Sequence, residues 1–308
     1  MDVNRRVALA GLLSSLLPIS SLDAAPGART RLILLGTSGG PRPKKKRANS
    51  AQAIIAGGKI YLIDCGYGVT HQMVMAGLPL RQLRHIFVTH HHSDHDMELG
   101  PALQLAWAAG LTSRVDCWGP PPMHQMIRSY LEYESYDLAI RVKDEGRVPL
   151  APLIHPHELR GSGRVFQDEQ VLVTAAKVPH PPVDLAFAYR FDAHDRSIVI
   201  SGDTRPSRDL VRLAKGADVL VHEAMLSEHV GNLLQSLPDR ERLLRSVLGH
   251  HTTAEQAGQV AAQAGVKMLV LSHLVPGENP DVPDEEWAAA ARRHYSGPIV
   301  VGRDLLEI

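Results

Sequence analysis

His85-Ile86-Phe87-Val88-Thr89-His90-His91-His92-Ser93-Asp94-His95 is the stretch from which the fold and the chemistry of this chain are best inferred. Its apolar first half predicts a buried strand, and four residues with metal-binding side chains follow directly. If the chain stays extended, His90 and His92 point the same way and can bind one metal, while Asp94 and His95, beyond the bend, reach a second. The alternatives are a solvated polar loop and a His-rich tract that binds metal without a defined site, but neither would directly follow a buried strand.

Three further ligand-type residues stand just past other β-type runs. They are His180 after Val171–Lys177, Asp203 after Ile198–Ile200, and His273 after Met268–Leu271. Active sites of layered sheets collect at strand ends. Any one of these residues alone is better explained as a cap or a core residue, but their number and common placement predict a shared metal site.

The rest of the chain alternates short strand-like runs with helical ones, in the pattern of a layered α/β fold. Strands are expected at Arg31–Leu35, Ala51–Ala56, Ile60–Asp64, His85–Thr89, Val115–Trp118, Val171–Lys177, Leu185–Phe191, Ser197–Ser201, Val219–Val221 and Met268–Leu271. Helices are expected at Thr70–Ala76, Ala102–Ala109, Ser207–Lys215, Ala254–Ala264 and Glu285–His294. No composition break marks a boundary, so residues 26–308 are predicted to form a single domain.

Residues 1–25 have the pattern of a signal peptide. Arg5-Arg6 precedes an apolar run, Val7–Ile19, and small residues lead to Ala25. This order is typical of secretory signals, and the paired arginines favour the twin-arginine type. An ordinary secretory signal and a cytosolic amphipathic extension are the alternatives. The expected location is periplasmic or secreted, and no later segment is apolar and long enough to span a membrane.

Composition narrows the function classes. Lys and Arg number 33, as do Asp and Glu, so no global field attracts nucleic acid or an anionic membrane. Two cysteines are too few for a disulfide scaffold. Histidine is abundant at 17 residues, in agreement with a metal site.

Over residues 30–305 the sequence resembles the metallo-β-lactamase superfamily, in its ribonuclease Z and arylsulfatase-like branch. The resemblance is carried by Leu35-Gly36-Thr37-Ser38-Gly39-Gly40, Ile63-Asp64-Cys65-Gly66, the histidine motif, Ser201-Gly202-Asp203-Thr204, His222-Glu223-Ala224, His251-Thr252-Thr253-Ala254 and Leu271-Ser272-His273. It implies a four-layer αβ/βα sandwich with two zinc ions. One zinc would be held by His90, His92 and His180, the other by Asp94, His95 and His273, with Asp203 bridging. Manganese and iron stay open as alternatives.

Two further motifs of this branch suggest a general acid. The resemblance implies that Glu223 orients His251, which protonates the leaving oxygen. Asp94 is placed with this pair among the catalytic residues. Met225 departs from the family's His-Glu-Ala-Thr pattern. The alternatives are that His251 merely stands next to a helix N-terminus capped by a following threonine, or that the adjacent His250 is the acid.

The function expected from the sequence is an exported dinuclear-zinc hydrolase of a small phosphodiester or aryl sulfate, acting by metal-bound hydroxide. A lactone, amide or carboxyl-ester hydrolase is the alternative, and a non-catalytic metal-binding protein ranks below it. RNA is disfavoured because export removes the protein from transfer RNA. In addition, His180 and Asp203 are only 23 residues apart, which leaves no room for an RNA-gripping arm. The expected partner is therefore a small-molecule ester, with no nucleic acid and no membrane after signal cleavage, and a homodimer is left open.

Two segments keep more than one interpretation. The loop Lys44–Arg47 carries four cations that are suited either to a phosphate or sulfate group or to solvent. The segment Trp107–Tyr136 holds aromatic residues that either wall an apolar pocket or belong to the ordinary core.

Overall fold

A computed structural model of the chain describes residues 29–233, 238–279 and 282–308. The predicted signal peptide, residues 1–25, lies outside the described residues. In the described ranges, no helix combines the length and apolar character needed to cross a bilayer.

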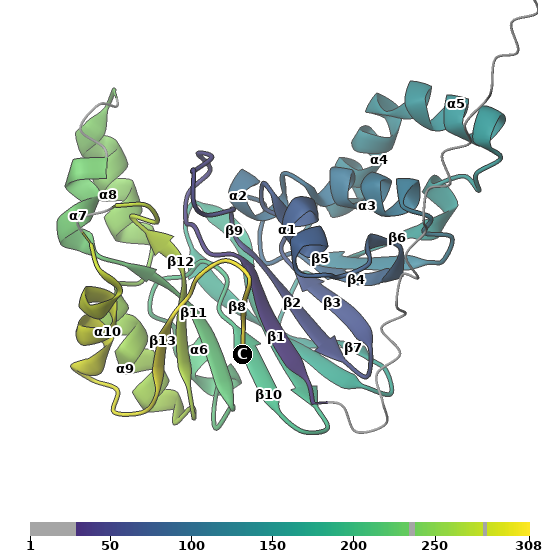
Figure 1. The fold of residues 1–308 in the computed structure, drawn as a ribbon. Coiled ribbons are helices and arrows are strands. Elements are labelled where there is room, and N and C mark those ends of the chain that lie inside the picture. Colours follow the sequence, from purple (N-terminus) through teal and green to yellow (C-terminus); the bar gives the residue numbers. More distant parts are fainter. Residues whose placement is uncertain (1–28, 234–237, 280–281) are drawn as a thin grey trace, which may run out of the picture.

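Two mixed seven-stranded sheets form the centre of the molecule (Figure 1). The first has the order β14-β1-β2-β3-β4-β5-β6, with β1 Arg31–Gly36, β2 Ala51–Ala56, β3 Lys59–Ile63, β4 Leu83–Phe87, β5 Val115–Gly119, β6 Ile154–Glu158 and β14 Leu306–Glu307. The second has the order β13-β12-β11-β10-β9-β8-β7, with β7 Gly163–Gln167, β8 Val171–His180, β9 Val183–Ala193, β10 Ser197–Ile200, β11 Val219–Met225, β12 Leu269–Val275 and β13 Ile299–Val301.

The two sheets pack face to face through apolar side chains. Leu32 and Leu34 of β1 lie in the core between the sheets, whereas Ile33 of the same strand points to the opposite face. This alternation follows from the two-residue period of a strand. Phe87 of β4 meets Phe191 of β9 edge to face, with ring centroids 5.1 Å apart. Aromatic contacts of this kind join the two halves of the molecule.

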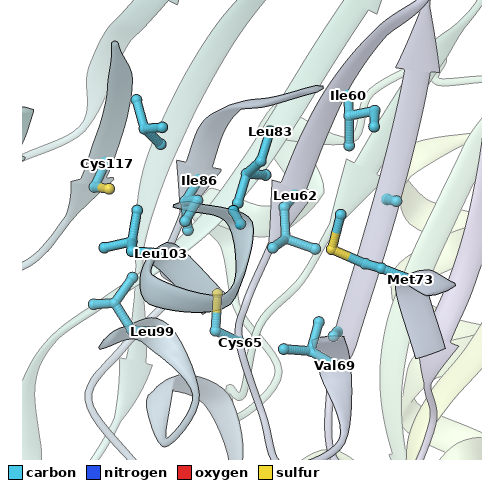
Figure 2. Close-up of a cluster of buried hydrophobic side chains, with 14 of the residues drawn as sticks. Ile60, Leu62, Cys65, Val69, Met73, Leu83, Ile86, Leu99, Leu103 and Cys117 are labelled. Carbon is cyan, nitrogen blue, oxygen red and sulfur yellow. The ribbon is translucent and has the colours of Figure 1, made fainter. Parts of the chain in front are cut away.

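Helices cover the outer face of each sheet. On the first sheet they are α1 Val69–Met75, α3 Leu99–Ala108 and α4 Met123–Tyr133, and on the second α6 Arg208–Leu213, α9 Ala254–Ala264 and α10 Asp284–Arg292. Figure 2 shows side chains of β3, β4, α1 and α3 meeting in the first of these outer cores, where Cys65 and Cys117 are both buried and unpaired. The predicted four-layer αβ/βα sandwich is confirmed.

Two helical projections rise beside the edge that carries the short helix α2, Ser93–Asp96 (Figure 1). One consists of α4 and α5, Ser135–Glu145, and the other of α7, Ser227–Leu233, and α8, Arg240–His250. The sequence-based expectation missed all four helices. The described residues of α5 and α8 include none that is fully buried. Their few apolar residues pack only at the margins of the core clusters, so the apolar stripe of each helix is short and partly exposed.

Candidate metal centre

The histidine motif behaves locally as its spacing predicts. The chain leaves β4 and stays extended as far as His92, whose φ is −105° and ψ 147°, before turning into α2. His90 Nε2 and His92 Nδ1 consequently lie 3.0 Å apart. Asp94 and His95 sit on α2, past the bend, and both are buried.

A first group of candidate metal ligands combines side chains from both sheets. Its members are His90, His92, His180 and Asp203, whose ligand atoms lie within 4.8 Å of one another. His180 Nε2 is 3.2 Å from His92 Nδ1, and Asp203 Oδ2 is 3.8 Å from the Nε2 atoms of both His90 and His180. Ligands about 2.0–2.1 Å from a tetrahedral zinc are separated by roughly 3.4 Å, so these spacings fit a metal ion.

A second group lies on the other side of Asp203. It is made by Asp94, His95 and His273. His273 Nε2 is 3.2 Å from Asp94 Oδ2 and 3.3 Å from Asp203 Oδ2, and His95 Nε2 is 3.2 Å from Asp203 Oδ1. The Asp203 carboxylate therefore faces both groups.

Some polar atoms of these groups have no partner within the protein. His95 Nε2 and Asp203 Oδ1 are buried without a hydrogen-bond partner. Orphaned polar atoms are costly to bury, and a cation between them would remove that cost. Burial also lowers the pKa of His90, and it lowers the pKa of His180 to about 4. Both rings are therefore held in the neutral form that binds metals.

Asp64 is a site residue to which the sequence analysis assigned no role. Its carboxylate accepts hydrogen bonds from His95 Nδ1 at 2.8 Å and from the backbone N–H of Thr89 at 2.7 Å. These bonds fix the His95 ring with Nε2 turned toward Asp203. A carboxylate directly after the buried strand β3 was the available signal.

The sequence predicts that His273 comes after its strand. In the structure, His273 instead lies inside β12. Ser272 pairs with Glu223 and Leu274 with Ala224, so His273 is the extra residue of a β-bulge. Its φ is +46°, in the left-handed region that residues with a Cβ rarely adopt. The bulge turns the imidazole toward the cluster.

Glu223 and His251 form the pair that the motifs imply. His251 Nδ1 lies 2.8 Å from Glu223 Oε2. Burial lowers the pKa of His251, but the charge of Glu223 and the hydrogen bond to it, with the charges of Asp203 and Asp94, raise that pKa to about 9. The ring is consequently protonated at neutral pH.

The alternative, that His251 stands next to a helix N-terminus capped by a threonine, is compatible with the Glu223–His251 pair. Thr253 caps α9 through a capping box with Gln256, so a threonine does cap the helix. The His250 ring contacts Ser246, while its backbone oxygen accepts from His180. Among the two adjacent histidines, only His251 reaches Glu223 in the described structure.

A cavity of about 400 Å³ opens onto the cluster, and its walls differ from those the sequence suggested. The apolar side chains come from Leu243 and Val247 of α8, from Val275 and from Pro41 of the β1–β2 loop. Within the segment Trp107–Tyr136, Trp107 is buried in the core, and Tyr133 and Tyr136 are exposed on the α4–α5 projection. None of the residues of this segment lines the cavity.

Two of the four loop cations serve the fold. Lys44 Nζ donates to the carbonyl of Gly39 at 2.8 Å, and Arg47 donates to Thr37 and to the carbonyl of Gly302. Lys45 and Lys46 are exposed. Lys44 and Arg47 therefore stabilise the loop, whereas Lys45 and Lys46 are accessible to a ligand.

Comparisons with known proteins match the chain to one family model and to relatives that have a different name. The family model described as Anti-Pycsar protein Apyc1 matches residues 30–270. Ribonuclease Z of Mycolicibacterium gilvum is 32% identical over 275 residues, 88% of this chain and 93% of that protein. Ribonuclease Z of Mycobacterium avium is also 32% identical, over 88% of this chain and 95% of that protein.

Solved structures match the fold. The metallo-β-lactamase fold protein YhfI of Bacillus subtilis superimposes with a TM-score of 0.68 at 18% identity, over 91% of this chain and 98% of that one. The short form of human tRNase Z gives a TM-score of 0.65 at 22% identity, over 90% and 98% of the two chains. The expectation of a metal-dependent hydrolase is confirmed.

Two other expectations are wrong. The relatives are named ribonuclease Z, which contradicts both a small-ester or aryl-sulfate substrate and the absence of nucleic acid as a partner. The inference from the short His180–Asp203 segment concerned one segment alone and carried no information about the other surfaces of the chain. The inference from zero net charge used only the total charge and took no account of where the charged side chains lie on the surface. Neither the arylsulfatase-like assignment nor export finds support in these relatives.

Proposed function

This chain belongs to the family described as Anti-Pycsar protein Apyc1, within the ribonuclease Z branch of the metallo-β-lactamase superfamily, and on this premise we propose that it is a metal-dependent phosphodiesterase of RNA. The observation that carries the proposal is Asp203, shared between two groups of buried ligands and 3.8 Å from His251 Nδ1. Metal ligands and a candidate proton donor thus converge on one point.

We assign one metal ion to His90, His92 and His180 and a second to Asp94, His95 and His273, with Asp203 between them. Imidazole and carboxylate ligands suit zinc, and they also accept manganese or iron. When bound, such a pair of ions lowers the pKa of water to roughly 7 and neutralises charge on a phosphate oxygen.

The Glu223–His251 pair supplies the proton. Glu223 accepts the Nδ1 proton of His251, which lines the cavity, and so leaves Nε2 as the ring nitrogen that Glu223 does not bind. We assign to this Nε2 the proton that passes to the departing ribose oxygen. A leaving alcohol needs such protonation because its own pKa is far above 7.

Local charge supports an RNA substrate despite the neutral composition. Arg42, Lys45 and Lys46 are exposed on the loop at one side of the cavity, and α8 forms the other side. That helix exposes Arg240, Arg242 and Arg245, and of these Arg245 lies 3.8 Å from the exposed Glu241. Cations on both sides of a cleft are suited to neutralising a nucleic-acid backbone.

The test is cleavage of RNA by protein loaded with zinc or manganese. Because one structural relative is named tRNase Z, we would use a precursor transfer RNA, an unstructured RNA and a DNA strand of the same sequence. Asp203→Ala removes the shared ligand, and Asp209→Ala changes an exposed aspartate on α6 as the matched control.

We expect cleavage of RNA that a chelator or Asp203→Ala abolishes and that Asp209→Ala leaves intact. Metal-loaded, folded protein that leaves all RNA uncut would refute the proposal. So would cleavage that survives Asp203→Ala.

A further inference from the structure

Leu243 is an exposed leucine with no evident structural reason to be one. It is 36% exposed on α8, and it lines the cavity beside the metal-ligand groups. Val247, four residues later, lies on the same face of the helix and also lines the cavity. Val247 packs in turn on a small apolar cluster that includes Val275.

The opposite side of the cavity is polar. Arg42 and Lys44 line it, and the turn at Gly40 donates a backbone hydrogen bond of 2.8 Å to Asp94 Oδ2. The cavity thus has acidic and imidazole groups at one end, cations on one wall and aliphatic carbon on the other. With metal ions held by the acidic and imidazole groups, that end would attract an anion. A nucleotide then has the matching distribution, with an anionic phosphate at one end and a flat, weakly polar base at the other.

We propose that Leu243 and Val247 form the seat for the nucleoside next to the scissile phosphate, an inference that rests on the proposed function. Their side chains carry no hydrogen-bond donor or acceptor, so this wall contacts the face of a base or the ribose without reading a base edge. The seat therefore contributes affinity with little base selectivity.

The size of the cavity limits what enters it. At about 400 Å³ it lies near the lower end of the roughly 300–1,000 Å³ range of ligand sites. It accommodates one nucleotide unit, and the rest of an RNA chain would lie outside, along the exposed cations of α8 and the loop.

The experiment compares two phosphodiesters that share their leaving group, uridine 5′-(p-nitrophenyl phosphate) and methyl p-nitrophenyl phosphate. In both, water adds to phosphorus and p-nitrophenolate departs, so only the nucleoside differs. Leu243→Ala should lower kcat/KM for the uridine ester about fivefold, mainly through KM, and that for the methyl ester less than twofold. Leu243→Met, which keeps apolar contact area, should restore most of the loss.

Leu248 offers a matched control on the same helix. It is 41% exposed but does not line the cavity. Leu248→Ala should leave both esters unaffected. Binding of uridine 5′-monophosphate and of methyl phosphate to the metal-loaded proteins, measured by calorimetry, gives a readout that does not depend on turnover. Leu243→Ala should weaken only the nucleotide.

An equal loss on both esters would overturn the proposal, because it would mean that the substitution disturbs the metal site. An unchanged uridine ester and an unchanged nucleotide affinity would also overturn it. If no ester and no RNA is cleaved while Leu243→Ala still selectively weakens uridine 5′-monophosphate, the seat stands and the proposed RNA hydrolysis fails.

Discussion

His251 illustrates how a single side chain acquires its proposed role from its neighbours. A histidine alone has a pKa near 6.5, whereas the charge of Glu223 and the bond to it raise that of His251 to about 9 against the effect of burial. The proton is therefore available at neutral pH, and the test of its use lies in the leaving group.

His251→Ala should slow cleavage of RNA, whose leaving oxygen is an alkoxide, by about 100-fold or more. Cleavage of p-nitrophenyl phosphodiesters should slow far less, because nitrophenolate departs without a proton. Parallel rate measurements on the two substrates check this. Equal losses would show that His251 has a role other than that of an acid.

His85 is a half-buried histidine outside the metal site. Its ring stacks on Tyr61, with centroids 5.1 Å apart, and its Nδ1 has no partner. Burial lowers the pKa of His85 to about 4. As the pH falls, His85 therefore binds a proton at a lower pH in the folded protein than in the unfolded chain, where histidine titrates near 6.5.

Because the folded pKa is lowered, His85 should reduce stability as the pH falls from about 6.5 toward 4. His85→Phe removes this effect. We expect wild type to lose up to about 2 kcal/mol more than His85→Phe between pH 7 and pH 5, measured by urea unfolding of each protein at both values. Identical pH dependence in the two proteins would contradict the buried neutral form.

At the scale of elements, the β12 bulge and the β1–β2 loop pack together to place His273. A Cβ added to Gly39 would lie 2.7 Å from the His273 ring and 2.5 Å from Val275 Cγ2. The absence of a side chain at this position therefore lets the bulged histidine reach Asp94 and Asp203.

Gly39→Ala should displace the His273 ring and weaken metal binding about 10- to 100-fold, the range typical of disturbed ligand support. Competition with a chromophoric chelator measures this affinity. Gly161→Ala is the matched control, since nothing lies within 4 Å of a Cβ there. If Gly39→Ala binds metal as wild type does, the proposed use of His273 as a ligand is wrong.

At the scale of the whole molecule, the proposed ligands come from both halves. His90, His92, Asp94 and His95 follow β4 of the first sheet, and His180, Asp203 and His273 belong to the second. Bound metal would consequently tie the two sheets together at one edge, and its affinity for the folded state would add to stability.

Purified protein should hold about two metal ions per chain, and a chelator should lower its Tm by about 5 °C or more. Elemental analysis and calorimetry measure the two quantities. Asp203→Ala should hold fewer ions and show a smaller shift on chelation. A wild-type Tm that is indifferent to chelator would exclude metal ions as ties between the sheets.

The fold class and the candidate metal-binding residues could be predicted from the sequence, because both follow from the order of residues along short segments. A buried strand followed directly by His90, His92, Asp94 and His95 places these side chains through backbone geometry alone. The expected strands were found for the same reason, since their apolar runs are short and continuous. The apolar residues of α5 and α8 are few and none is fully buried, so these helices were missed.

The contacts that those residues make could not be predicted from the sequence. The bulge at His273 depends on how β12 pairs with β11, and the contact of Asp64 with His95 spans 31 residues. The wall at Leu243 and the gathering of arginines beside it likewise depend on where α8 packs. Net charge and segment length are sums over the chain and contain no positions, which is why they led to the wrong conclusion about nucleic acid. Contacts between distant segments are set by the packing of the whole chain.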